Sequence, residues 1–281
     1  MSMRIDLHVH STASDGTLSP AEVVRDALDQ GVSVLALTDH DSMDGVPEAV
    51  DAAARLGVQL IPGVELNTDV DAGEVHILGY FIPLDSEWFQ ALLASRRRAR
   101  VERGEKMVRR LRELGCDISF DAVKRLARGG AITRPHVARA LVEAGYARSV
   151  EDAFARYLYT GGPAYVKREN FTPEEAVKAV LKAGGVPVLA HPGRLSDEGI
   201  IPGLLAAGLQ GLECYYPEHT PEQTDRFLAL ANEHDLVVTG GTDAHGPGSR
   251  HERRIGSVSA PADVVERLME RKARLALRRA T

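Results

Sequence analysis

Residues 4–10 of the chain read RIDLHVH, an apolar run that ends in two histidines, and the predicted fold depends on how often this pattern recurs. Residues 32–41 read VSVLALTDHD, which is again an apolar run that ends in acidic and imidazole side chains. Short runs rich in Val, Ile and Leu that are bounded by polar residues are typical of buried strands. The sequence therefore predicts strands whose ends carry side chains of the kind that bind metal ions.

Strands and helices alternate along the chain on either side of these two runs. Strands are expected at residues 4–9, 32–37, 59–66, 74–81, 186–190, 212–215 and 236–239. Helices are expected at residues 20–30, 46–56, 173–183, 200–207, 221–234 and 262–274. The runs at 59–66 and 74–81 are separated by Asp69, Asp71 and Gly73, so this pair is expected to form a hairpin. Because strands that alternate with helices imply a mainly parallel sheet, the fold class is α/β, and the number of units favours a distorted βα barrel.

The strand pattern disappears between residues 87 and 159. A long helix is expected at 87–114, followed by shorter helices with boundaries near the glycines at 115, 129–130, 145 and 161–162. We therefore expect a discontinuous barrel domain formed by residues 1–98 and 168–281. Residues 99–167 are expected to form an all-helical insertion that caps the site.

Basic residues are concentrated in this helical region. Of the 34 basic and 40 acidic residues in the chain, 18 and 8 respectively lie between Arg96 and Arg168. That region is net positive, whereas the rest of the chain is strongly acidic, which indicates an anionic ligand held beside the basic segment. A solvated helical surface is the alternative.

Composition favours a soluble cytoplasmic protein. There is no apolar run long enough to span a membrane, and the first residues lack the apolar segment of a signal peptide. The two cysteines, Cys116 and Cys214, are not in a CxxC pair, so we expect two buried free thiols rather than a thiolate metal site.

Histidine and carboxylate residues recur at the ends of the expected strands. His8 and His10 lie two apart on a strand, so both side chains project to the same side. A lone pair of this kind could be two partly buried polar residues, but the carboxyl ends of strands in a βα barrel converge on one face. Another strand ends near Glu213. The candidate metal ligands are His8, His10, Asp15, His40, Glu65, His76, His191, Asp243 and His245.

Divalent cations would make the burial of so many ionisable groups possible, because uncompensated burial costs several kcal/mol. Mixed imidazole and carboxylate ligands suit Zn, Mn or Fe(II), and the absence of cysteine ligands disfavours a closed structural zinc site. The candidate ligands suffice for two or three ions that share bridging groups. Closely spaced ions of this kind bind both the attacking and the leaving oxygens of a phosphoryl group, so we predict a phosphoesterase.

These motifs resemble those of the PHP (polymerase and histidinol phosphatase) family. The matching elements are His8-Val9-His10 with Asp15, Thr38-Asp39-His40-Asp41, His191-Pro192 and Thr242-Asp243-Ala244-His245, with Glu65 and His76 also at ligand positions of the family. The resemblance implies a distorted (βα)7 barrel of PHP type with a trinuclear metal centre. It implies three divalent ions per chain, with manganese favoured and iron, zinc or magnesium as alternatives.

Within the family, the resemblance is to the RNase AM-like 3′,5′-nucleotide bisphosphate phosphatases. It rests on residues 6–20 (DLHVHSTASDGTLSP), 63–68 (GVELNT), 75–80 (VHILGY) and 132–136 (ITRPH). The resemblance implies removal of the 3′-phosphate from nucleoside 3′,5′-bisphosphates, and 5′-to-3′ exoribonuclease activity on short 5′-phosphorylated RNA.

The same resemblance implies how the ligands would be shared among the ions. One ion would take His8, His10, Glu65 and Asp243. A second would share Glu65 and take His76 and His191, and a third would take Asp15, His40 and His245.

The helical insertion is expected to bind the phosphate that does not react. Arg97, Arg100 and Arg134 are the candidates, since arginines bind phosphate oxygens in a bidentate way and Arg134 begins a helix. Lys167 and Arg168 are weaker candidates. A histidine is expected to protonate the leaving sugar oxygen, and the sequence does not choose between His191 and His219.

Two other functions stay open at this point. The metals could serve another small phosphate monoester such as histidinol phosphate, or the barrel could be a non-catalytic RNA-binding regulatory module. The second alternative is disfavoured because every ligand position is filled by a capable residue. The expected ligands are a nucleotide and short RNA, with no membrane and no obligate protein partner.

Overall fold

The computed structural model of the protein describes residues 3–69, 74–127, 132–167, 171–249 and 251–280. The chain forms two compact units, the first from Met1–Ala91 with Asn170–Thr281 and the second from Leu92–Glu169. The expected cap arrangement of residues 99–167 over the site stays a prediction.

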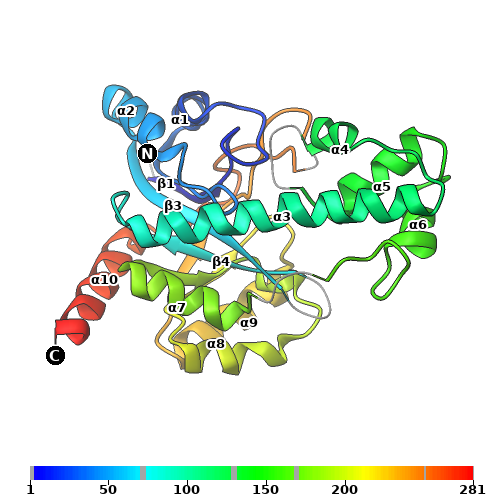
Figure 1. Cartoon of the computed structure of the whole chain (residues 1–281). Helices are drawn as coiled ribbons and strands as arrows, with labels where there is room; N and C mark the ends of the chain where they lie inside the picture. Colours follow the sequence, from blue (N-terminus) through cyan, green and yellow to red (C-terminus); the bar gives the residue numbers. More distant parts are fainter. Residues whose placement is uncertain (1–2, 70–73, 128–131, 168–170, 250, 281) are drawn as a thin grey trace. The chain divides into compact units, whose positions relative to one another are not determined.

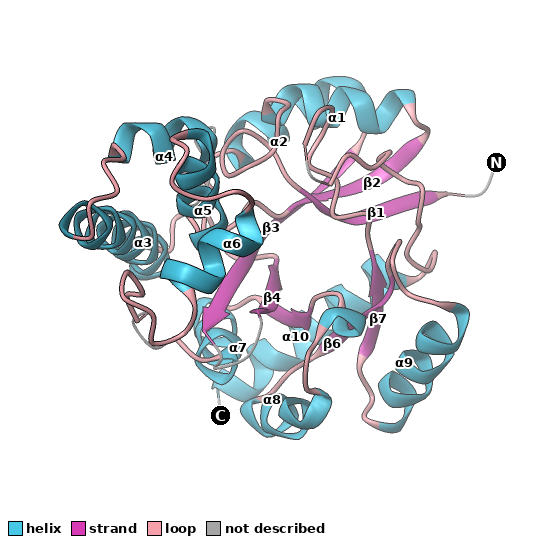
Figure 2. Ribbon diagram, turned by 90° about the vertical axis from the view of Figure 1, so that its right-hand side faces the viewer, coloured by secondary structure: helices cyan, strands magenta, loops and turns pink. Residues whose placement is uncertain are grey.

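The first unit is built on one seven-stranded sheet. Its strands are β1 (Arg4–Val9), β2 (Val32–Leu37), β3 (Gln59–Asp69), β4 (Glu74–Tyr80), β5 (Val186–Leu189), β6 (Gly211–Tyr215) and β7 (Val237–Gly240). They lie in the order in which they occur in the sequence, β1 to β7. Figure 2 shows β1, β2, β3, β4, β6 and β7 with α1, α2, α8 and α9 on the outside.

The sheet closes on itself between β1 and the segment after β7. The amide of His10 donates to the carbonyl of Ala244 at 2.9 Å, and the amide of Asp243 donates to the carbonyl of His8 at 2.7 Å. Closure removes the exposed sheet edges, as in other barrels. The protein is therefore a distorted (βα)7 barrel with a helical insertion, as predicted.

Strand β4 causes the distortion. It runs antiparallel to both β3 and β5, whereas the pairs β1–β2, β2–β3, β5–β6 and β6–β7 are parallel. A short connection can only return the chain antiparallel, because a parallel crossover needs a dozen or more residues. The predicted hairpin is confirmed.

The helices of this unit are α1 (Pro20–Asp29), α2 (Val46–Leu56), α7 (Pro173–Ala183), α8 (Ile201–Ala207), α9 (Pro221–Glu233) and α10 (Val264–Ala280). Ser19, Thr172 and Thr220 form capping boxes before α1, α7 and α9, and each is followed by proline at the first helical turn. Such caps satisfy the free amides at the start of a helix.

Helix α10 continues past the predicted end at residue 274, because the following residues are good helix formers with no glycine or proline. Two 3-10 turns that were not predicted, Pro192–Arg194 and Glu198–Ile200, follow β5.

The apolar core of the first unit draws on most of its strands and on α10. Ile5 and Leu7 of β1, Tyr80 of β4 and Leu268 of α10 belong to one buried cluster. The hydroxyl of Tyr80 donates to the carbonyl of Leu7 at 2.8 Å, so this large side chain is buried with its polar atom satisfied. The buried core therefore holds together the strands whose ends carry the candidate ligands.

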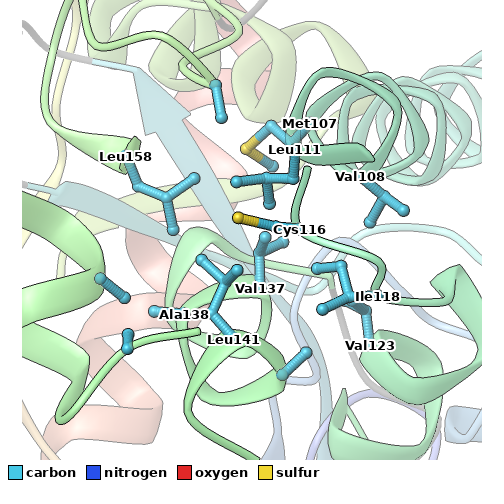
Figure 3. Close-up of a cluster of buried hydrophobic side chains, with 14 of the residues drawn as sticks. Met107, Val108, Leu111, Cys116, Ile118, Val123, Val137, Ala138, Leu141 and Leu158 are labelled. Atoms are coloured by element: carbon cyan, nitrogen blue, oxygen red, sulfur yellow. The ribbon is translucent and has the colours of Figure 1, made fainter. Parts of the chain in front are cut away.

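The second unit is all-helical, as predicted for the insertion. It contains most of α3 (Glu87–Glu113), then α4 (Phe120–Ala127), α5 (Arg134–Glu143), α6 (Val150–Ala153) and a π-helical turn (Phe154–Leu158) (Figure 1). Its own core includes Met107, Leu111, Cys116, Val137 and Leu141 (Figure 3). In the part of the chain that the structure describes, no helix is both long and apolar enough to cross a lipid bilayer.

Candidate metal centre

Glu65 lies at the centre of a cluster of histidines. It is a residue of β3, just beyond the part of that strand that pairs with β2. Its Oε2 atom is 3.3 Å from Nε2 of His8, 3.2 Å from Nε2 of His10 and 2.9 Å from Nδ1 of His40. Its Oε1 atom is 2.8 Å from Nδ1 of His76 and 3.2 Å from Nε2 of His191. Five histidines from four different strands and their ends thus face one fully buried carboxylate.

Asp243 faces the same cluster from the end of β7. Its Oδ1 atom is 3.2 Å from Nε2 of His10, 3.6 Å from Nε2 of His8 and 3.5 Å from Nδ1 of His245. Asp243 has a φ of 53°, in the left-handed region that non-glycine residues rarely adopt. Backbone strain of this kind is common where a side chain must be held in a functional position.

Asp15 completes the cluster on the side of β1 and β2. Its carboxylate oxygens lie 3.2 Å from Nε2 of His245 and 3.8 Å from Nε2 of His40. The rings of His10 and His245 stack with centroids 4.0 Å apart. The structure therefore brings all nine predicted ligands together, from segments far apart in the sequence.

Three groups within the cluster have a geometry suited to a cation, since each offers ligand atoms within 4.8 Å of one another. The groups are His8, His10, Glu65 and Asp243; His10, Asp15, His40 and His245; and His40, Glu65 and His76. The first group is a set that the family resemblance implies for one ion, and the second is the implied set of Asp15, His40 and His245 with His10 added. The third group shares Glu65 and His76 with the remaining implied set but has His40 in place of His191. His191 lies outside these groups, although it contacts Glu65.

The polar atoms of the cluster are arranged for a ligand that accepts lone pairs. Among the described residues, Nε2 of His8, both ring nitrogens of His10 and Oε2 of Glu65 are buried and make no hydrogen bond. Buried polar atoms are rarely left in this state, because the lost solvation is costly. Divalent cations fit this donor set, since imidazole nitrogens and carboxylate oxygens would become their ligands.

The charges of the cluster agree with this conclusion. Burial by itself would raise the pKa of Glu65, but the surrounding imidazoles outweigh it and hold that pKa well below its ordinary value. Burial lowers the pKa of His40, but Glu65 and Asp15 outweigh it and raise the pKa to about 9. Protons on imidazoles therefore balance the carboxylates in the metal-free protein, and cations would replace those protons.

Comparison with known proteins assigns the family. The sequence pattern of the PHP domain matches residues 6–163, more than half of the chain. The chain belongs to the PHP domain family. It is accordingly a phosphoric ester hydrolase.

Named relatives match the PHP chain over most of its length. The 3′,5′-nucleoside bisphosphate phosphatase of Chromobacterium violaceum is 38% identical over 87% of this chain and 88% of its own. The 5′-3′ exoribonuclease Rnm of Escherichia coli is 36% identical over 86% of this chain and 85% of its own. A solved structure from Bifidobacterium adolescentis, described as a metal-dependent phosphoesterase, is 34% identical with a TM-score of 0.78, covering 96% of this chain and 97% of its own.

Two buried carboxylates near the cluster, those of Asp39 and Asp6, accept hydrogen bonds from neighbouring loops. Asp39 accepts hydrogen bonds from the amide and hydroxyl of Ser11 and from the hydroxyl of Ser14. Asp6 accepts from Thr242 and from the amide of Gly256. Both are buried and hold the loops that carry the ligands.

The end of β6 supplies polar groups that the sequence did not single out as ligands. Both oxygens of Glu213 contact the cluster, one at His8 and one at the amide of His191. The hydroxyl of Tyr216 donates to Oδ2 of Asp243 at 2.9 Å. The position of Glu213 at a strand end was a signal for it, whereas nothing in the sequence pattern pointed to Tyr216.

Two arginines near the cluster were also missed. Arg253 donates to the hydroxyl of Tyr216 at 2.9 Å and contacts Oδ2 of Asp243 at 3.3 Å. Arg194 donates to the same hydroxyl at 3.2 Å, and its side chain is 35% exposed. The only sequence signal for Arg194 is that it closely follows the His191-Pro192 motif, and Arg253 lies in a polar loop without a pattern.

His251, in the polar loop after β7, is half-buried. Its ring lies 5.2 Å from that of His245, and the amide of His245 donates to its carbonyl. Burial lowers the pKa of His251 to about 4. Because the surrounding loop is polar, no signal in the sequence indicated that His251 is partly buried.

The candidate proton donor His219 lies at the edge of the cluster. Its Nε2 atom accepts from the amide of Gly193 at 3.1 Å, and its Nδ1 atom lies 2.9 Å from the carbonyl of Cys214. With a donor at Nε2, the ring proton belongs on Nδ1. His219 thus joins the segments that follow β5 and β6.

The predicted phosphate-binding residues Arg97, Arg100 and Arg134 lie in the second unit. Arg134 has its guanidinium 5.7 Å from the ring centroids of both Phe154 and Tyr165. Lys167 lies in the same unit, and Arg168 lies outside the described residues. Their contact with substrate stays a prediction.

Proposed function

We propose that the protein removes the 3′-phosphate of nucleoside 3′,5′-bisphosphates to give nucleoside 5′-monophosphates, and that it degrades short 5′-phosphorylated RNA from the 5′ end. The observation that carries this proposal is the cluster of nine ligand-type side chains that has Glu65 at its centre. Relatives named for these two activities match most of the chain. One site can perform both reactions, because each breaks an ester bond at the 3′ phosphate of a 5′-phosphorylated nucleotide.

The predicted ligands would hold up to three divalent ions, with manganese favoured. Bound ions would supply Lewis-acid polarisation of the phosphoryl group and activate water as the nucleophile. The His and carboxylate side chains would fix where such ions bind, and Asp39 and Asp6 hold the loops that carry these side chains.

We propose that arginines of the chain bind the two phosphate groups of the substrate. Arg194 is the half-exposed cation beside Asp243, so it is placed to contact the oxygens of the reacting phosphate. Arg97, Arg100 and Arg134 are proposed to bind the second phosphate, which would select a 5′-phosphorylated substrate.

The leaving sugar oxygen needs a proton, and His191 and His219 are the candidates. The ring nitrogens of His219 both contact main-chain groups, so it would donate a proton only after one of these contacts broke. His191 faces Glu65 through Nε2. The choice can be tested with leaving groups of different basicity, as argued below.

The direct test is incubation of the purified protein with adenosine 3′,5′-bisphosphate and Mn²⁺. Release of phosphate together with 5′-AMP is expected. Release of 3′-AMP would contradict the assigned position of cleavage, and no release at all would contradict the function. A panel that includes histidinol phosphate measures the alternative substrate class.

Glu65→Gln is the matched loss-of-function variant, because it keeps the size of the side chain and removes the charge at the centre of the cluster. We expect its phosphate release to fall by at least about 100-fold, as is typical when a group central to catalysis is lost. An active Glu65→Gln variant would show that the cluster is not the site of the reaction.

A further inference from the structure

Strand β6 is the one strand of the barrel whose end contributes none of the nine predicted ligands, yet it carries a buried carboxylate. Glu213 is fully buried. Burial of a carboxylate is unfavourable unless charges or hydrogen bonds compensate for the lost water. The contacts of its two oxygens therefore indicate what the residue does.

Each oxygen of Glu213 contacts a different candidate ligand. Oε1 lies 3.0 Å from Nδ1 of His8, and Oε2 accepts a hydrogen bond from the amide of His191 at 2.7 Å. One carboxylate thus joins the side chain of a β1 residue to the main chain after β5. It belongs to none of the three groups that could hold a cation.

The contact with His8 determines how that ring can act. If Nδ1 carries the proton and donates a hydrogen bond to Glu213, the lone pair of Nε2 is free for another partner. Nε2 is the atom that faces Glu65 and Asp243, and it makes no hydrogen bond among the described residues. In metal sites, a carboxylate on the far side of a ligating histidine fixes its tautomer and raises its basicity.

The contact with His191 stabilises an unusual backbone. His191 has a φ of 28° and a ψ of 60°, in the left-handed region that costs free energy for a non-glycine residue. Glu213 holds its amide, and two residues later the amide of Gly193 donates to His219. Both supporting groups come from β6 and the segment after it, so this part of the chain holds the backbone that carries the ring of His191.

We propose that Glu213 is a positioning residue of the metal centre. It fixes the tautomer of His8 and the backbone of His191, and it raises the affinity for divalent cations without binding them. This inference rests on the metal centre of the proposed function, and its test is chosen so that the two can fail separately.

Glu213→Gln is the sharpest variant. An amide of the same shape offers one acceptor oxygen and one NH₂ group, so it cannot accept from both His8 and the amide of His191. Glu233→Gln makes the same chemical change at an exposed position on α9 and serves as the control. Mn²⁺ binding would be followed by the electron paramagnetic resonance signal of the free ion, which requires no substrate.

We expect Glu213→Gln to bind Mn²⁺ about 10- to 100-fold more weakly than the wild type, the range found when groups behind metal ligands are removed. Glu233→Gln should bind as the wild type does. Equal affinity of Glu213→Gln and the wild type would overturn this inference alone. A wild type that binds no Mn²⁺ would overturn the metal centre of the proposed function.

A second measurement applies if Glu213→Gln fails to fold. In the Zn²⁺-loaded wild type, ¹⁵N–¹H correlation of the assigned His8 ring should show the proton on Nδ1 and none on Nε2. A proton on Nε2 would overturn the inference, because that nitrogen could then not face the cation.

Discussion

At the scale of single residues, the clustering of the candidate ligands could be predicted, whereas most of the residues that support them could not. His8, His40, His191 and Asp243 each follow an apolar strand pattern, and the barrel geometry then places such strand ends together. Tyr216 and Arg253 have no comparable sequence context, because their role depends on Asp243, which is distant in sequence. The sequence around a loop tyrosine does not show whether its hydroxyl donates to a carboxylate that is distant in the chain, as Tyr216 does to Asp243.

The support of Asp243 leads to a prediction for Tyr216→Phe. Tyr216 donates to Oδ2 of Asp243, while Oδ1 faces the histidines. Loss of the hydroxyl leaves Asp243 less well oriented, so we expect kcat to fall about 10-fold in a folded protein. Tyr215→Phe removes a hydroxyl from the adjacent residue and is the control. Equal kcat for both variants would show that the hydroxyl of Tyr216 is dispensable.

A second prediction distinguishes a proton donor from a structural brace at His219. Because both ring nitrogens contact main-chain groups, we expect His219→Gln to slow hydrolysis of a nucleoside 3′-phosphate and of p-nitrophenyl phosphate by similar factors. A general acid would matter much less for the p-nitrophenyl ester, whose leaving group needs no proton. A loss confined to the nucleotide, of about 100-fold or more, would identify His219 as the donor.

At the scale of elements, helices with explicit caps and strands with continuous apolar runs were predicted well. Strands β1 and β2 and helices α2 and α7 have the predicted bounds. The 3-10 turn at Pro192–Arg194 was missed, since it depends on the unusual backbone of His191 and the contacts of its neighbours. Strand β3 is longer than predicted because its polar end pairs with β4 along the hairpin.

The approach of β7 to β1 leads to a prediction for Gly241→Ala. An added Cβ at Gly241 would lie 2.4 Å from Cβ and 2.5 Å from the amide nitrogen of His8, where the main chain cannot give way cheaply. We expect a loss of about 1–3 kcal/mol or more in unfolding free energy, measured with urea, and weaker Mn²⁺ binding. Gly203→Ala lies in α8, where the added carbon meets only the flexible end of Glu174, so stability should change little or rise. An unchanged stability of Gly241→Ala would contradict the closeness of the two segments.

At the scale of the whole molecule, the barrel and the helical insertion could be predicted from the change in sequence pattern near residue 87. The antiparallel place of β4 followed from the short hairpin connection. The nine candidate ligands come from segments that span residues 8 to 245, so the cluster that could hold metals forms only when the complete barrel has closed. Removal of the metals should therefore affect the stability of the first unit as a whole.

The pH dependence of this stabilisation can be predicted from the metal-free cluster. Glu65 and Asp15 raise the pKa of His40 to about 9 against burial, from an ordinary value of 6.5. A raised pKa in the folded state contributes stability that is complete below pH 6.5 and is lost as the pH rises through 9. The lowered pKa values of Glu65 and Asp243 contribute stability above their ordinary values of 4.5 and 3.8, and this is lost in acid.

The lowered pKa of His251, about 4, likewise contributes stability above pH 6.5 that is lost toward acid, so the metal-free protein should be most stable near pH 6.5. Mn²⁺ should stabilise it more as the pH rises. Ligating imidazoles must be neutral, so each proton displaced from the cluster weakens Mn²⁺ binding about tenfold per pH unit toward acid. Thermal unfolding with EDTA and with Mn²⁺, at pH 6 and at pH 8, measures both effects. We expect the increase in Tm on addition of Mn²⁺ to be larger at pH 8. An increase that is equal at the two pH values, or larger at pH 6, would show that protons and metal ions do not compete for these histidines.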